Sequence, residues 1–332
     1  MDESRTADAP TLNQSPSSRF PVRAISLAIV LVMVIYVGMA TLADSDAFST
    51  AVAALPGMLW VQVVLLSLLS YLLRFVRWHY FIIALGDSVP VLRNLEIYLA
   101  AFALTLTPGK AGETMRSVYL YPYRVSYPKS IGAFVAERLL DLVAVGALAS
   151  LVISMFPEYR LWLLGSIVCS VTVLLLLFPR LLSLAVKRLT KGFLGSHAAK
   201  GMSTIGFLLT GRRLVVGLPL SFMAWAVQGT SLCLIIQALG HDLPTVTVIG
   251  IYCMSILAGA ASLIPGGLGA TEVAIVLLLS AAGVDQTDAI TASFISRGLT
   301  LWLAVGIGVF TMTKTALANQ SPRSPQSKEK DC

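Results

Sequence analysis

Residues 106–113 read LTPGKAGE, and residues 263–272 read LIPGGLGATE. Both stretches contain Pro-Gly, two further residues, a glycine and then a glutamate. Each glutamate is followed 25 residues later by an arginine inside an apolar run. Motif, order and spacing therefore agree in two parts of the chain, which indicates an internal repeat. A duplication kept only for folding is the alternative. The pairs are Glu113 with Arg138 and Glu272 with Arg297.

The composition around these stretches is that of a membrane protein. Of the 332 residues, 56% are hydrophobic and 12% charged, against about 25% charged in a typical soluble domain. The apolar runs are continuous and about 20 residues long, the length that a membrane-spanning helix needs, whereas barrel strands alternate in shorter segments. The sequence predicts an all-α polytopic membrane protein. The expected spans are 24–43, 55–73, 131–156, 161–178, 214–239, 246–264 and 289–312.

Both Pro-Gly stretches interrupt apolar runs. The run 94–107 is too short to span comfortably and stops at Pro108, and the run 246–264 stops at Pro265, ahead of a short apolar helix over 271–282. Each stretch therefore predicts a broken or re-entrant helical hairpin, followed by an arginine-bearing transmembrane helix.

The expected organisation is one transmembrane domain between two tails. Polar composition predicts disordered tails, and the hydrophobic runs fall between them. The expected segments are a tail over 1–22, the domain over 23–315 with repeat halves 93–156 and 245–313, and a tail over 316–332.

Charge between the runs predicts orientation. Residues 179–213 contain seven Lys or Arg and no acidic residue, and residues 74–93 and those after 314 are also basic. These segments are expected in the cytoplasm, together with both termini, because cytoplasmic loops are enriched in Lys and Arg. Residues 74–80 combine basic and aromatic side chains, which favours a place at the membrane interface. The basic residues follow topology, so no nucleic-acid partner is expected.

This orientation places the first Pro-Gly element on the cytoplasmic side and the second on the outer side, so the halves are expected to be inverted repeats. Inverted repeats with broken helices that meet near the midplane are typical of transporters. A charge at the centre of a membrane helix costs about 2.5–3.5 kcal/mol, so the motif charges must be paired or face a wet cavity. The structural alternative is a set of salt bridges that clamp the hairpins, including an Arg138–Asp141 pair along one helix.

The functional interpretation is an anion site. Arginine binds phosphate oxygens with two parallel hydrogen bonds and stays charged. Glycines ahead of short helices would let backbone amides point at the same anion, although Pro-Gly can also simply break a helix. The acidic residues would be counter-ions or proton carriers. The candidate substrate-binding residues are Arg116, Arg138, Arg297, Gly109, Gly112, Gly266, Gly267 and Gly269, and the candidate counter-ions are Glu113, Asp141 and Glu272.

These motifs together resemble a known family. The segments TPGKAGETMR (107–116), ERLLD (137–141) and PGGLGATE (265–272), followed by Arg297, resemble the transmembrane region of lysylphosphatidylglycerol synthases, a flippase-like membrane family. The likeness covers about residues 25–315. It implies that Glu113, Arg116, Arg138, Asp141, Glu272 and Arg297 occupy the polar motif positions of the family. In bifunctional synthases this region moves aminoacylated phosphatidylglycerol between leaflets. Because no aminoacyltransferase domain follows residue 315, a stand-alone member without aminoacyl transfer is expected.

The sequence thus predicts a lipid translocase of the cell inner membrane. Its partner is a polar-headed lipid, anionic or polyprenyl-linked. No catalytic residue, metal or cofactor is expected. One alternative is a polyprenyl-phosphate-dependent glycosyltransferase, which the lack of acidic residues in 179–213 disfavours. The other is a small-solute transporter or an accessory membrane subunit.

Overall fold

The structure, a computed structural model, describes residues 45–155, 161, 165 and 193–320. Its described secondary structure is helical, as predicted. The predicted span 24–43, most of 161–178 and the tail 1–22 lie outside the described residues. The α-helices are α2 (Ser45–Ala54), α3 (Gly57–Ala84), α4 (Val91–Ala100), α5 (Arg116–Leu120), α6 (Tyr127–Ala149), α9 (Phe193–Leu208), α10 (Gly211–Ala238), α11 (Thr245–Ala261), α12 (Ala270–Ala281), α13 (Gln286–Arg297) and α14 (Leu303–Gln320). The short 3-10 helices are η1 (Ala101–Leu104), η2 (Pro108–Met115), η3 (Tyr121–Tyr123), η4 (Ser150–Met155) and η7 (Pro265–Gly267). The element η8 (Gly298–Trp302) is a π-helix.

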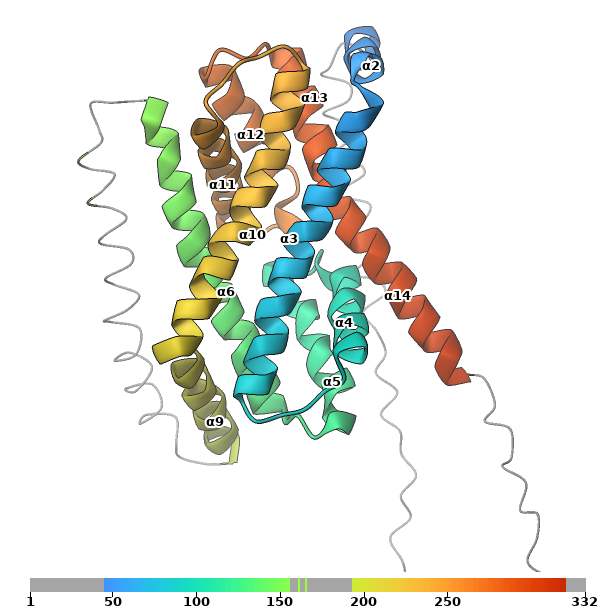
Figure 1. Cartoon of the computed structure of the whole chain (residues 1–332), viewed down its shortest axis with the longest axis vertical. Helices are drawn as coiled ribbons and strands as arrows, with labels where there is room; N and C mark the ends of the chain where they lie inside the picture. The colour runs from blue at the N-terminus through green and yellow to red at the C-terminus, as the bar shows by residue number, and fades with distance from the viewer. Residues whose placement is uncertain (1–44, 156–160, 162–164, 166–192, 321–332) are drawn as a thin grey trace, which may run out of the picture.

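The long helices α3 and α10 pack side by side along the body, and α6 packs against α10 (Figure 1). The elements α11, α12 and α13 occupy the upper half in this view, and α4 and α5 the lower half. The two Pro-Gly turns, η2 and η7, contact each other between these halves. The predicted interruptions at Pro108 and Pro265 are therefore present, and they bring the two motifs together.

Prolines mark where several of these helices begin. Pro56, Pro90 and Pro244 directly precede α3, α4 and α11, and Pro128 lies in the first turn of α6. Proline suits these positions because its fixed φ matches a helix start and the N–H it lacks would have no partner there.

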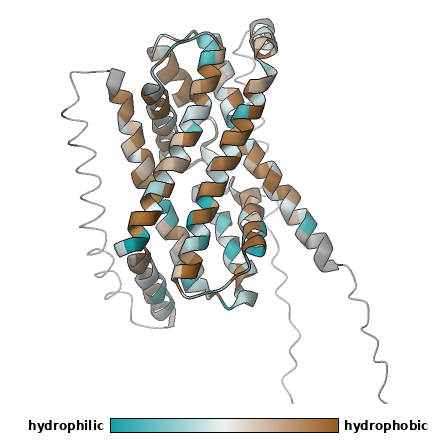
Figure 2. Cartoon of the chain, viewed as in Figure 1, coloured by the Kyte–Doolittle hydropathy of each residue, from teal (hydrophilic) through white to brown (hydrophobic). Residues whose placement is uncertain are grey.

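Within the described residues, three helical stretches are long and apolar enough to span a membrane, namely Gly57–Ala84, Gly211–Ala238 and Gln286–Lys314. Figure 2 shows hydrophobic residues over most of the length of these helices. In α3, Leu65 and Leu72 are more than half exposed on the outside, whereas Arg77 is fully buried. An apolar outer face and a polar inner face are what a membrane environment favours.

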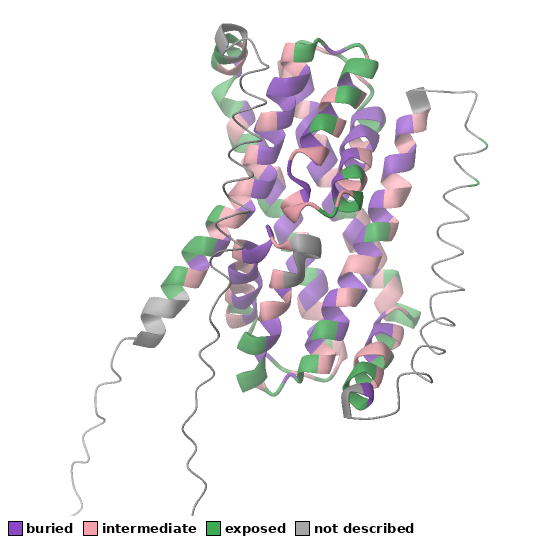
Figure 3. Cartoon of the chain, turned by 180° about the vertical axis from the view of Figure 1, so that it is seen from behind, coloured by how far each residue is buried: buried purple, intermediate pink, exposed green. Residues whose placement is uncertain are grey.

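The core of the described residues contains two large apolar clusters, one mainly from α10–α13 and one mainly from α3, α4 and α6. Figure 3 shows buried residues where the helices face one another and exposed residues mainly on outer faces and ends. A third, small cluster of Leu106, Leu268 and Leu301 joins the two Pro-Gly segments to η8. The two motif segments thus share an apolar contact at the centre of the body.

The predicted continuous helix over 289–312 is interrupted in the structure. It begins at Gln286, and directly after Arg297 a π-helical turn, Gly298–Trp302, separates α13 from α14. In this turn the hydroxyl of Tyr71, on α3, donates a hydrogen bond to the carbonyl oxygen of Thr300. A π-turn is invisible to hydropathy, and such turns are frequent at functional sites. The final helix continues to Gln320, into the segment predicted as a tail.

Candidate functional site

A cavity of about 310 Å³ lies where the two Pro-Gly segments meet α3, α6, α10 and α11. Tyrosine, tryptophan and leucine side chains form much of its wall, together with charged groups from both halves of the chain. Its volume is at the lower end of the range of about 300–1,000 Å³ usual for ligand pockets. The charged residues that line it are Arg74, Glu113, Arg138, Asp141 and Arg297.

Polar stripes on α3 and α10 build one wall of this region. Ser70 Oγ donates to the carbonyl oxygen of Ala224 at 2.9 Å, and Arg77 Nη1 donates to the hydroxyl of Ser221. Residues three or four apart share one face of a helix, so each stripe stays on the inner side. The stripes consist of Ser67, Ser70, Arg74 and Arg77 on α3 and of Ser221, Trp225 and Gln228 on α10.

Three arginines and three carboxylates alternate around a closed ring in the lower half. The ring runs Arg77, Glu137, Arg116, Glu113, Arg138, Asp141 and back to Arg77. Neighbouring groups lie 2.7–3.4 Å apart, except Arg138 Nη2 and Glu113 Oε2 at 3.9 Å. Because each charge has two opposite neighbours, the ring compensates charges that membrane burial would otherwise make costly.

A separate ion pair closes the upper Pro-Gly segment. Arg297 Nε lies 2.8 Å from Glu272 Oε1, and Arg297 Nη2 donates to the carbonyl oxygen of Gly266 at 2.8 Å. The backbone amide of Gly269 donates to the other carboxylate oxygen of Glu272 at 2.7 Å. The two residues that the sequence pairs by spacing thus join α12 to the end of α13, and Arg297 also holds the turn η7 through Gly266.

Arg74 forms no direct ion pair in the part of the chain that the structure describes, and its charge acts on the Asp141 carboxylate only at longer range. It is 7% exposed and donates through Nη2 to the neutral Gln228 Oε1 at 2.8 Å. Its guanidinium carbon lies 4.1 Å from the centroid of the Trp225 ring, and its Nε has no hydrogen-bond partner. A buried charge whose direct partners are neutral costs free energy, which a bound anion would offset.

The predicted motif residues fall into two groups. Arg138, Arg297, Glu113 and Asp141 line the cavity, as Gly266 and Gly267 do. Arg116 does not: it is 2% exposed, bridges two carboxylates of the ring and lies under the Trp78 ring at 4.3 Å. Arg116 therefore has the position of a structural residue.

The glycines serve close packing at the turns. Gly266, Gly267 and Gly269 all have positive φ. A Cβ on Gly112 would lie 2.7 Å from Leu104 Cβ. Gly109 lies within η2. The amides of Gly112 and Gly269 are bonded to side-chain oxygens of the chain itself, so in this state they do not point at an empty anion site as predicted.

Gly266→Ala is expected to destabilise the protein by about 1–3 kcal/mol. Gly266 has φ +65°, and a Cβ there would lie 2.9 Å from Leu106 Cδ2 on the other Pro-Gly segment. Thermal unfolding in detergent measures the loss. Gly86→Ala is the matched control, because Gly86 also has positive φ but open space around it. Equal losses in the two variants would mean that the contact between the segments is not tight.

Three charged residues of the described site were not among the predicted site residues: Arg74, Arg77 and Glu137. The first two were placed at a membrane interface, and the structure corrects this, because α3 continues to Ala84 and buries both. The basic segment 74–93 therefore contributes only Arg93 to the orientation signal. The available signal was the helical spacing of Ser67, Ser70, Arg74 and Arg77, which places them on one face.

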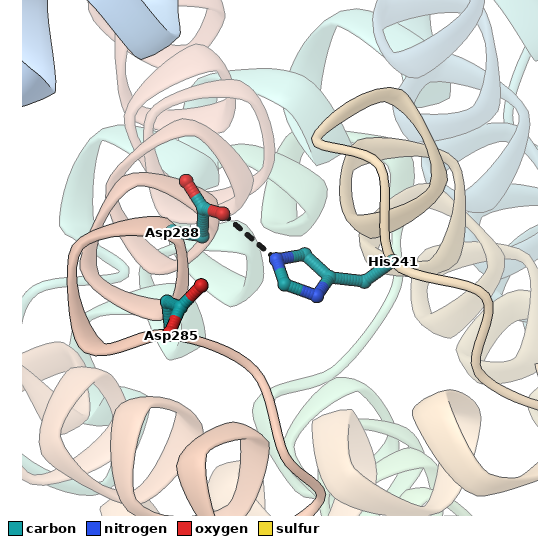
Figure 4. Close-up of side chains that lie close together, drawn as sticks. All are labelled: His241, Asp285 and Asp288. Carbon is teal, nitrogen blue, oxygen red and sulfur yellow. Dashed lines mark hydrogen bonds and ion pairs between the residues drawn. The ribbon is translucent and has the colours of Figure 1, made fainter.

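A second cluster of titratable side chains lies at the upper end of the body (Figure 4). His241 comes from the turn after α10, and Asp285 and Asp288 from the start of α13; their ligand atoms lie within 4.8 Å of one another. His241 Nε2 and Asp288 Oδ2 are 2.7 Å apart. These groups could hold a metal ion, but the His241–Asp288 pair already fixes the start of the helix that carries Arg297.

The sequence matches the family described as Lysylphosphatidylglycerol synthase TM region over residues 23–308. A UPF0104 membrane protein of Methanothermobacter thermautotrophicus is 25% identical over 280 residues, which cover 75% of this chain and 83% of the relative. Another, from Pyrococcus horikoshii, is 24% identical over 292 residues, which cover 76% and 87%. The matched range contains every charged residue of the cavity and the ring. The chain is therefore a membrane protein that belongs to the family of the lysylphosphatidylglycerol synthase transmembrane region.

Proposed function

We propose that this protein is a lipid translocase that binds the anionic head group of a membrane lipid between its two halves. The observation that carries the proposal is Arg74, a buried cation on the cavity wall whose described partners are neutral. In a membrane body such a charge is costly, and residues of this kind usually mark a substrate pathway.

The cavity is open toward the outer surface of the described body, which favours a lipid over a water-soluble solute. Leu142 of α6 and Leu263, just after α11, both line the cavity, and they are 55% and 76% exposed. An apolar side opening in a membrane body would let acyl chains stay in the bilayer while the head group reaches the arginines.

We further propose that the two halves are inverted-topology repeats. The order helix, Pro-Gly turn, short helix and arginine-bearing helix occurs as α4, η2, α5 and α6, and again as α11, η7, α12 and α13. The first set starts from the lower end and the second from the upper end (Figure 1). Such repeats allow a central site to face each side of the membrane in turn.

We propose that the lower end faces the cytoplasm, with both termini on that side of the cell inner membrane. Arg93, Lys129, Arg212 and Arg213 belong to the lower ends of helices, whereas the described turns at the upper end carry His241 and carboxylates. Cytoplasmic loops are enriched in Lys and Arg, which supports this orientation.

We propose that the protein binds and moves its lipid without catalysing a reaction on it. The two carboxylates on the cavity wall, Glu113 and Asp141, both pair with arginines. A general acid or base needs a carboxyl group that is free to exchange a proton with the substrate. The ion pairs therefore favour a transporter over a membrane glycosyltransferase.

Ala260→Trp is expected to slow lipid movement several-fold, because Ala260 is exposed and lines the cavity beside its side opening. The purified protein would be placed in vesicles with phosphatidylglycerol labelled on an acyl chain. Bleaching of the outer-leaflet label by dithionite then reports the rate at which label crosses. Ala261→Trp, an exposed neighbour outside the cavity lining, is the control and should keep the wild-type rate. If wild-type protein gives no faster crossing than protein-free vesicles for any lipid, the proposal fails.

A further inference from the structure

Resting on the proposed function, we infer that the site selects a lipid head group with one negative charge, a phosphodiester, over zwitterionic, cationic and multiply charged head groups. The inference comes from the balance of charge in the interior. The candidate substrates differ in the net charge of their head groups. They are the anionic and polyprenyl-linked lipids that the sequence leaves open, and lysylphosphatidylglycerol, after which the family is named.

Among the charged side chains of the described interior, the cations outnumber the anions by one. Five arginines face four carboxylates: the ring holds three of each, Arg297 pairs with Glu272, and Arg74 is left over. The other described ion pairs that involve Lys or Arg are at the lower rim and partly exposed. A single negative charge beside Arg74 therefore balances the charged side chains of the described interior.

Head groups with any other net charge leave part of the charge in the cavity uncompensated. A diphosphate brings at least one further negative charge close to Glu113 and Asp141, which line the same cavity. A lysyl ester of phosphatidylglycerol carries two ammonium groups and one phosphodiester, so it adds positive charge beside Arg74. In a medium of low effective dielectric constant, like charges a few ångströms apart interact strongly, so each mismatch weakens binding.

The hydrogen-bond donors on the wall fit a phosphodiester as well. Among the described side chains that line the cavity, three buried donors have no hydrogen-bond partner (Arg74 Nε, Arg138 Nε and Trp225 Nε1), against one buried acceptor, Asp141 Oδ2. Buried N–H groups in proteins nearly always have a partner. The two unesterified oxygens of a phosphodiester are strong acceptors, whereas an ammonium group offers none.

The first arm of the test ranks lipids on wild-type protein in nanodiscs of neutral lipid by native mass spectrometry. The probes are dioleoyl phosphatidylglycerol, phosphatidylcholine, lysylphosphatidylglycerol and a polyprenyl diphosphate. Phosphatidylglycerol is expected to bind about ten-fold more tightly than each of the others. Soluble glycerophosphoglycerol, which has the same phosphodiester without acyl chains, should compete far more weakly if the ligand is a lipid; equal competition would identify a soluble phosphodiester as the ligand and overturn the lipid assignment.

The second arm changes the charge balance. Glu113→Gln raises the surplus from one positive charge to two, so preference should shift about ten-fold toward the diphosphate lipid. Glu96→Gln, which removes a carboxylate of an exposed pair outside the cavity, should leave the ranking unchanged. The wild-type ranking stands without the variant if Glu113→Gln does not fold.

The outcomes separate the two proposals. Tight binding of a diphosphate or lysyl lipid by wild-type protein overturns the charge inference and leaves lipid translocation in place. An unchanged ranking in folded Glu113→Gln also overturns it. Absence of selective binding and of crossing for every lipid overturns the proposed function itself.

Discussion

Replacement of Arg74 by glutamine is expected to lower the affinity for phosphatidylglycerol by about 10- to 100-fold, the loss of one charge-assisted hydrogen bond of about 1.5–3 kcal/mol. The same change should leave the thermal stability unchanged or raised. Arg74 is buried and its direct partners among the described residues are neutral, so its removal relieves a charge that no direct ion pair compensates. A residue whose loss weakens binding without weakening the fold is the mark of a site kept ready for a ligand.

Titration of phosphatidylglycerol into protein in nanodiscs measures the affinity, and thermal unfolding of the same samples measures the stability. Arg74→Lys keeps the charge without the planar fork and should fall between wild type and Arg74→Gln. Arg93→Gln removes a cation of a partly exposed pair and should bind as wild type does. Unchanged affinity in Arg74→Gln, or a marked loss of its stability, would make Arg74 a structural residue.

Arg77→Met should have the largest effect on stability, a loss of about 3–5 kcal/mol. Arg77 is fully buried and holds both Glu137, at 3.3 Å, and Asp141, at 2.7 Å. Methionine leaves these two carboxylates in the interior with one fewer cation and opens the ring. The remaining arginines of the ring, on other segments, cannot take its place without moving their own partners.

Thermal or denaturant unfolding in detergent tests this expectation. Arg93→Met is the matched control, because the Arg93–Glu96 pair is more than one-third exposed on both sides and should contribute about 0–1 kcal/mol. Similar losses in the two variants would show that the ring does not behave as a buried network.

The sequence predicted the features that depend on order and local chemistry. The breaks at Pro108 and Pro265 follow from the missing N–H and fixed φ of proline, and they appear as short turns between helices. The equal spacing from glutamate to arginine also had structural meaning for Glu272 and Arg297, which form a direct pair. For Glu113 the pair with Arg138 is long, and the closer partner is Arg116.

The ring and the unpaired cation could not be predicted in this way. Arg77 contacts Glu137 and Asp141, which lie 60 and 64 positions later in the sequence. Only the packing of α3 against α6 and α10 brings these residues together. At the end of an apolar run, basic and aromatic residues resemble an interface anchor. The same pattern belongs to a buried polar stripe when the helix continues, and hydropathy alone does not separate the two cases.

The most direct test of the account is to identify the lipids that wild-type protein retains when it is extracted from its membrane without detergent exchange. We expect one anionic phosphodiester lipid to be enriched over the surrounding membrane, and that enrichment to disappear in Arg74→Gln. A retained lipid composition equal to that of the bulk membrane in both proteins would contradict a lipid site in this cavity.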